Sequence, residues 1–171
     1  METQQELNAL SNGIMTSGSL FNHWQGHRRV TRRLIEIFPE EQLFEFSIGG
    51  MRSFADMVKE ISGLSGIGMR GLVTGDWTST PELDYRSGKS VVSTKAELLC
   101  LWDEITVEID SLWPQIPYQR FHEVIQAFVE YEGYTLDIIL YWIDNEVHHR
   151  AQGYVYLRAL GIEPPAFWNR D

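Results

Sequence analysis

Four long stretches carry an apolar residue at every third or fourth position, and this spacing constrains the fold more than any other feature of the chain. It predicts four helices, over Ser19–Phe38, Ser53–Leu72, Thr94–Trp113 and Thr135–Leu160. Pro39 and Pro114 end two of these helices, and Gly161 is placed to cap the last. The segment from Pro117 to Gly133 has a mixed pattern that fits either a short helix or a strand.

A change of composition separates the second and third predicted helices. From Thr74 to Ser93 the chain is rich in Gly, Asp, Thr, Ser and Pro, which indicates a long connection rather than a domain boundary. A chain of 171 residues fits a single domain, here 1–171. We therefore expect an all-α fold, a four-helix bundle with a long crossover between helices 2 and 3. Four glycines predict an irregular end to the second helix: Gly63, Gly66, Gly68 and Gly71.

Charge and cysteine content narrow the class of protein. The net charge of −10 argues against binding to nucleic acid or to an acidic membrane, because both require a basic face. Basic residues gather only at His27-Arg28-Arg29 and Arg32-Arg33, which we interpret as a solvated helix face beside acidic neighbours. A single cysteine, Cys100, allows no internal disulfide and fits a reducing compartment. No apolar run reaches the ~20 residues that span a bilayer, so we expect a soluble cytoplasmic protein.

The last predicted helix concentrates polar groups in partly apolar surroundings. Residues four apart share a helix face, so Asn145 pairs with His149 and Asp144 pairs with His148, and either pair could hold a metal ion or a substrate group. Asn145 and His149 fall within an apolar stripe that runs from Ile138 past Trp142 and Tyr156 to Leu160. A second stripe covers another side of the helix, so one stripe would pack on the core and the other on a crossing helix or a second subunit. His23 and His27 form another pair of this spacing on the first helix.

Several of these motifs resemble a known family. The terminal run Glu146-Val147-His148-His149-Arg150-Ala151-Gln152 is followed by Tyr156-Leu157-Arg158-Ala159-Leu160-Gly161-Ile162 and Pro164-Pro165, and the second helix is led by Arg52-Ser53-Phe54. Together they resemble the DinB family of metal-binding four-helix-bundle proteins, also described as YfiT-like hydrolases and transferases. The resemblance covers nearly the whole chain.

The resemblance implies a metal site with altered ligands. Family members with an intact site use one histidine from the second helix and a His-x-x-x-His pair from the last. Here His149 is retained, while Asn145 and Glu60 stand at the other two positions. A carboxylate, an amide and an imidazole would hold a divalent metal such as Zn, Ni, Mn or Fe more weakly than three imidazoles. Without metal, the same groups could close a hydrogen-bonded cluster in which Glu60 accepts from the other two.

Two functions follow from the resemblance. In the first, the chain is a metal-dependent transferase or hydrolase that acts on a small-molecule substrate with a small thiol or water. Five further residues would shape or support the pocket: Tyr141, Trp142, His148, Arg150 and Tyr156. In the alternative, the protein is a catalytically inactive, stress-associated binding or structural dimer with a decayed metal site. Family members commonly form homodimers, and the apolar stripe of the last helix that contains Trp142 and Tyr156 gives a homodimer a physical reason.

Overall fold

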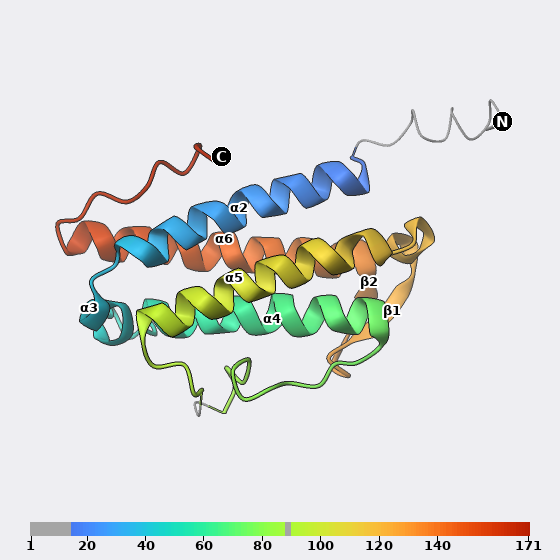
Figure 1. Cartoon of the computed structure of the whole chain (residues 1–171), viewed down its shortest axis with the longest axis horizontal. Coiled ribbons are helices and arrows are strands. Elements are labelled where there is room, and N and C mark those ends of the chain that lie inside the picture. The colour runs from blue at the N-terminus through green and yellow to red at the C-terminus, as the bar shows by residue number, and fades with distance from the viewer. Residues whose placement is uncertain (1–14, 88–89) are drawn as a thin grey trace.

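Four long helices lie side by side in the structure, a computed structural model that describes residues 15–87 and 90–171 (Figure 1). They are α2 (Ser17–Ile37), α4 (Phe54–Thr74), α5 (Lys95–Leu112) and α6 (Thr135–Ala159). Helix α4 packs against α5 and α6, and α2 packs against the same two helices. Shorter elements connect them: α3 (Glu40–Glu45), η1 (Trp113–Gln115), η2 (Tyr118–His122), β1 (Val124–Ala127) and β2 (Tyr131–Tyr134). The expectation of a mainly helical fold is confirmed.

Local capping chemistry explains where the helices begin and end. Ser53 and Thr94 cap α4 and α5 as predicted, and Thr94 forms a capping box with Glu97. Helix α2 begins two residues earlier than predicted, because Thr16 accepts a hydrogen bond from the backbone of Ser19. After α6, Gly161 adopts a left-handed conformation with φ of 76°, which a side chain would resist.

The glycines of α4 do not disrupt it, so the prediction of an irregular end was wrong. The helix continues to Thr74, and the glycines instead let aromatic rings approach its backbone. A Cβ atom added at Gly68 would lie 2.5 Å from the ring of Trp142, and one added at Gly63 would lie 2.3 Å from the ring of Tyr85. The rings of Trp142 and Tyr85 therefore occupy the space that side chains at Gly68 and Gly63 would take.

The segment of mixed pattern folds into a short antiparallel hairpin, which the all-α expectation did not include. Ala127 of β1 pairs with Tyr131 of β2, and the turn between them places Phe128 and Val129 at positive φ angles of 53° and 63°. Two consecutive positive angles are typical of the hairpin turn that favours Asn-Gly. A β-branched residue such as Val129 is strained there.

The apolar core fills the space between the four long helices. Trp24 of α2, Phe54 of α4, Trp102 of α5 and Tyr156 of α6 are all almost fully buried. The connection between α4 and α5 runs along the outside of α4 and buries Leu83 (Figure 1). None of the helices in the described part of the chain combines the length and apolar character needed to cross a membrane.

Candidate functional site

The structure brings together the three residues of the implied metal site. Glu60 lies in α4, and Asn145 and His149 lie one turn apart in α6, which packs against α4. The Asn145 amide donates to Oε1 of Glu60 at 2.9 Å, and Nε2 of His149 lies 3.1 Å from the same oxygen. Asn145 and His149 are buried. A single carboxylate oxygen thus accepts from two groups on the facing helix.

Arg52 completes this group of polar side chains, which we call the pocket cluster: Arg52, Glu60, Asn145 and His149. A guanidinium nitrogen of Arg52 lies 2.5 Å from Oε2 of Glu60, the oxygen that the other two residues leave free. The hydrogen bond from His149, together with those from Asn145 and Arg52, lowers the pKa of Glu60 from 4.5 to about 2 despite its partial burial. Glu60 is therefore a carboxylate at neutral pH.

Gln152 connects the pocket cluster to His148. Its Oε1 lies 3.4 Å from Nδ1 of His149, and its amide nitrogen lies 2.9 Å from Nε2 of His148. His148 itself is exposed on α6 and lies outside the cluster. The supporting role of His148 stays a prediction.

The pocket cluster has features that fit a divalent cation. Oδ1 of Asn145 is buried without a hydrogen-bond partner, and rotating the amide would turn this oxygen toward Glu60. Donor atoms at right angles around an ion with bonds of about 2.1 Å lie about 3.0 Å apart, close to the spacings seen here. If Nε2 of His149 binds the ion, its proton moves to Nδ1, where Gln152 offers an acceptor. Residues 15–87 and 90–171 contain no cluster of three His, Cys, Asp or Glu suited to a metal, so this donor set depends on the amide.

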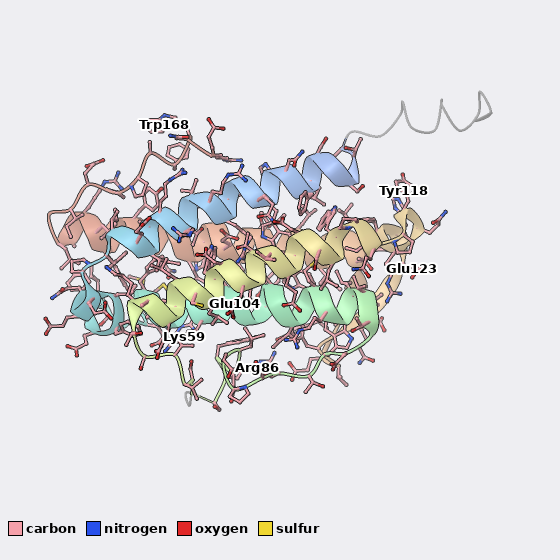
Figure 2. All side chains as sticks on the ribbon, in the orientation of Figure 1. Lys59, Arg86, Glu104, Tyr118, Glu123 and Trp168 are labelled. Atoms are coloured by element: carbon pink, nitrogen blue, oxygen red, sulfur yellow. The ribbon has the colours of Figure 1, made fainter. Side chains whose placement is uncertain are left out.

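A cavity of about 740 Å³ opens beside the pocket cluster, and Glu60 lines it. Much of its wall is aromatic, from Tyr85, Phe128, Tyr131, Tyr141 and Trp142. The connection after α4 contributes Tyr85 and Arg86, and α6 contributes Asp137, Ile138, Tyr141 and Trp142. The hairpin contributes Ala127, Phe128 and residues 130–133. Arg86 joins two of these segments through a hydrogen-bonded ion pair with Glu130 at 3.0 Å. Figure 2 shows Arg86 on the connection that runs beside α4.

The residues predicted to shape or support a pocket divide into two sets. Tyr141 and Trp142 line the cavity. Tyr156 does not line it but donates from its hydroxyl to the backbone carbonyl of Arg52 at 2.9 Å, which supports the segment that carries Arg52. Arg150 points to another part of the molecule, so its predicted place in the pocket was wrong.

Arg150 belongs to a second group of polar side chains, the sealed cluster: Trp24, Arg28, Thr31, Glu146 and Arg150. Glu146 accepts from Thr31 at 2.6 Å and from the indole of Trp24 at 3.3 Å, and Arg150 lies 3.7 Å away. Burial raises the pKa of Glu146, while Arg28 and Arg150 oppose that rise. These groups lie between α2 and α6, on another side of α6 from the cavity.

Arg28 corrects the interpretation of the basic residues as a solvated face. It is completely buried, donates to Thr106 at 2.9 Å and to the carbonyl of Trp102 at 3.0 Å, and stacks 4.0 Å from the Trp102 ring. Burial lowers its pKa to about 10, so the guanidinium stays charged at neutral pH. Within the predicted face only Arg29 is exposed, and His27 is buried.

His23 and His27 also come together, with their Nε2 atoms 3.1 Å apart. Arginines occupy the other nitrogen of each ring: Arg150 lies 2.7 Å from Nδ1 of His27, and Arg170 lies 3.2 Å from Nδ1 of His23. A guanidinium can only donate, so Nδ1 of each ring accepts, and the positive charge of the two arginines repels a cation from the pair. Burial and the neighbouring arginines lower the pKa of His27 to about 3. Both effects disfavour a metal cation at this pair.

The predicted physical reason for a homodimer is not supported, although the homodimer itself stays a prediction. Trp142 and Tyr156, from the stripe expected to meet a second subunit, are buried within the single chain. Exposed apolar side chains of α6 lie on a different face, at Leu140, Val147 and Val155. A dimer through α6 would use that face.

Sequence reasoning missed three contributors to this site. Arg52 belongs to the Arg52-Ser53-Phe54 motif, but its ion pair with Glu60 depends on the approach of the loop before α4 and leaves no local signal in the sequence. Tyr85 and Arg86 were assigned to a connection without a role, yet they form one wall of the cavity. The aromatic residue within a polar segment was the available hint.

Comparisons with known proteins bear on the family and the fold. The sequence profile of the DinB family matches residues 8–170. The crystal structure of a DinB-like protein, YjoA from Bacillus subtilis, aligns with a TM-score of 0.67, covering 86% of this chain and 96% of that chain at 17% sequence identity. At this identity the likeness shows a shared fold alone. A search among curated proteins found no match.

Proposed function

Because the chain belongs to the DinB family, we propose that it binds a small molecule in the cavity beside Glu60 and a divalent metal ion at Glu60, Asn145 and His149. We interpret α2, α4, α5 and α6 as the four helices of the family's bundle and residues 75–94 as its crossover. The metal is one that accepts mixed oxygen and nitrogen ligands, such as Zn, Ni, Mn or Fe.

The position of Glu60 carries this proposal. Its carboxylate lines the cavity and at the same time accepts from Asn145 and His149, so a cation held there would face a bound molecule. The unpartnered Oδ1 of Asn145 supplies a third donor. Arg52 engages the other oxygen of Glu60, which leaves Oε1 directed at α6.

The chemistry that fits this arrangement is transfer or hydrolysis on a small substrate. A bound divalent ion supplies Lewis acidity that polarises a substrate or lowers the pKa of a water or small thiol. Gln152 holds the His149 ring in orientation, and Trp142 and Tyr141 provide apolar surface for the substrate.

Metal content of untagged protein tests the proposal. Protein purified without a metal-binding tag, then incubated with Zn, Ni or Mn and desalted, should hold about one ion per chain by elemental analysis. His149→Ala should lose most of that metal, because the ring supplies the strongest neutral ligand. His122→Ala is the matched control, since this exposed ring belongs to η2 outside the pocket cluster and its loss should leave the metal content unchanged.

Two results would contradict the metal site. The first is wild-type protein that retains no metal after all three incubations. The second is an equal loss of metal in both histidine variants. Circular dichroism of each variant separates loss of a ligand from loss of the fold. Transfer of a small thiol to a model electrophile, measured with and without metal, then tests the chemistry.

A further inference from the structure

The cavity wall combines aromatic rings with carboxylates in a way that specifies one class of ligand. Five aromatic side chains line it, and four carboxylates join them: Glu60, Glu130, Glu132 and Asp137. Aromatic faces attract positive charge, most strongly where water is excluded. A volume of about 740 Å³ falls within the range of small-molecule sites.

Charge pairing leaves two of the four carboxylates available. Glu60 is paired with Arg52, and Glu130 is paired with Arg86. Across the part of the chain that the structure describes, no side-chain hydrogen bond or ion pair engages Glu132 or Asp137. Arg86 is the one guanidinium of the described lining, and Glu130 offsets its charge. The cavity therefore carries net negative charge beside its aromatic wall.

One cationic side chain, Arg86, already lies in the cavity wall. The guanidinium of Arg86 lies 5.7 Å from the ring centre of Tyr85 while its nitrogen meets Glu130. Tyr85, whose hydroxyl also accepts from Nε of Arg86 at 3.3 Å, and the carboxylate of Glu130 thus engage the same positive group. Tyr141 and Asp137 lie one turn apart on α6, both on the cavity, and offer the same two kinds of contact without a cation of their own.

We propose that the cavity selects a small organic cation, a protonated or quaternary amine with an apolar body. This inference rests on the proposed function in taking the cavity as the ligand site, but it does not require the metal. The charged end meets Asp137 and Glu132, and the apolar body covers the rings of Trp142 and Phe128. The overall charge of −10 raises the encounter rate of such a ligand at low salt.

A pair of isosteric probes tests the selection. Phenyltrimethylammonium and tert-butylbenzene have the same shape and differ in one positive charge. Calorimetry and tryptophan fluorescence on metal-free full-length protein should show the cation binding at least about tenfold tighter than the neutral probe. Raising the salt concentration should narrow the difference.

Substitutions in the wall locate the effect. Asp137→Asn and Glu132→Gln should each weaken binding of the cation about fivefold, the value of a solvent-exposed charge at close range. Tyr141→Leu should weaken it between about 2- and 30-fold through loss of the ring face. Asp144→Asn and Tyr118→Leu are the matched controls, because these exposed residues do not line the cavity.

The outcomes separate this inference from the proposed function. Equal affinity for both probes, binding of neither, or equal loss in the control variants would overturn the cation selectivity. Metal content measured on the same preparations is an independent result. One metal ion per chain without preference for the cationic probe would support the metal site and overturn the cation selectivity. Preference for the cationic probe in protein that takes up no metal would support the selectivity and overturn the metal site.

Discussion

Neighbouring residues of α6 take part in two polar clusters that differ in their access to solvent. Asn145 and His149 belong to the pocket cluster, while Glu146 and Arg150, each one residue later, belong to the sealed cluster. Glu60 of the pocket cluster lines an open cavity, and Glu146 of the sealed cluster is completely buried. Hydrogen bonds lower the pKa of Glu60, whereas burial raises the pKa of Glu146.

The difference shows which cluster is suited to binding and which to stability. Each residue of the sealed cluster forms a hydrogen bond within the protein, and none of its buried polar atoms lacks a partner, so nothing is left to engage a ligand. The pocket cluster retains an unpartnered oxygen on Asn145 and a carboxylate at the cavity wall. Buried charges that are fully paired serve the fold, and polar groups that remain unpaired are candidates for function.

Removing the carboxylate of the sealed cluster should have the largest effect. Glu146→Ala leaves Arg28 and Arg150 buried without their counter-charge and should lower the free energy of unfolding by about 3–5 kcal/mol. Glu60→Ala should cost clearly less, because its partner Arg52 is half exposed and regains water. Urea denaturation measures both. Glu163→Ala, at an exposed carboxylate, is the control, and equal costs at Glu146 and Glu60 would remove the distinction between the clusters.

Adding a methyl group behind the cavity wall should have the next largest effect. Gly68→Ala places a Cβ atom against the ring of Trp142, and such overpacking costs about 1–3 kcal/mol. Because Trp142 lines the cavity, the variant should also change ligand affinity, which a change in the sealed cluster should not do directly. Thermal unfolding and binding of phenyltrimethylammonium check the two effects. An unchanged affinity would show that the ring does not shape the site.

Acid should distinguish the pocket cluster through Glu60. Since its pKa is lowered from 4.5 to about 2, its contribution to stability is complete above pH 4.5 and is lost as the pH falls toward 2. After allowance for solvent screening, that contribution is about 1–2 kcal/mol. Urea unfolding between pH 6 and pH 3 should therefore show a steeper loss for wild type than for Glu60→Gln. Parallel pH profiles would mean that the carboxylate gains nothing from its three partners.

The smallest effect is expected at the turn that carries part of the cavity wall. Val129 is exposed with φ of 63°, a conformation that costs a side chain about 1 kcal/mol and glycine little. Val129→Gly should therefore raise the free energy of unfolding by up to about 1 kcal/mol, measured by urea denaturation. Val124→Gly, in the adjoining strand, should lower it instead. A loss of stability in Val129→Gly would indicate that the strain is absent.

Sequence reasoning recovered the parts of the molecule that local chemistry determines. Ser53 and Thr94 mark helix starts because their side chains bond the backbone three residues later. The hairpin was not predicted, because Phe128 and Val129 occupy a turn whose usual sequence signal is Asn-Gly. Local pattern alone could not distinguish a short helix from two strands there.

The candidate site was predicted in the same uneven way. Family resemblance identified Glu60, Asn145 and His149, and the structure brings them into hydrogen-bonding distance. The burial of Arg28 could not be predicted, because Trp102 and Thr106 reach it from a helix more than seventy residues away in sequence. Their contact depends on how the helices pack, which a single helical pattern does not encode.

The neighbouring positions of the two clusters also fix the rotation of α6 about its own axis. Successive residues of a helix point about 100° apart, so holding Glu146 and Arg150 against α2 sets the direction in which Asn145 and His149 face α4. The sealed cluster thus sets the orientation of the site residues, although it lies outside the cavity. Residues of the pocket cluster can then be exchanged for others, and the new side chains will point at the same place. A chain built in this way can exchange the side chains at positions 145 and 149 and keep the rotation of α6 unchanged.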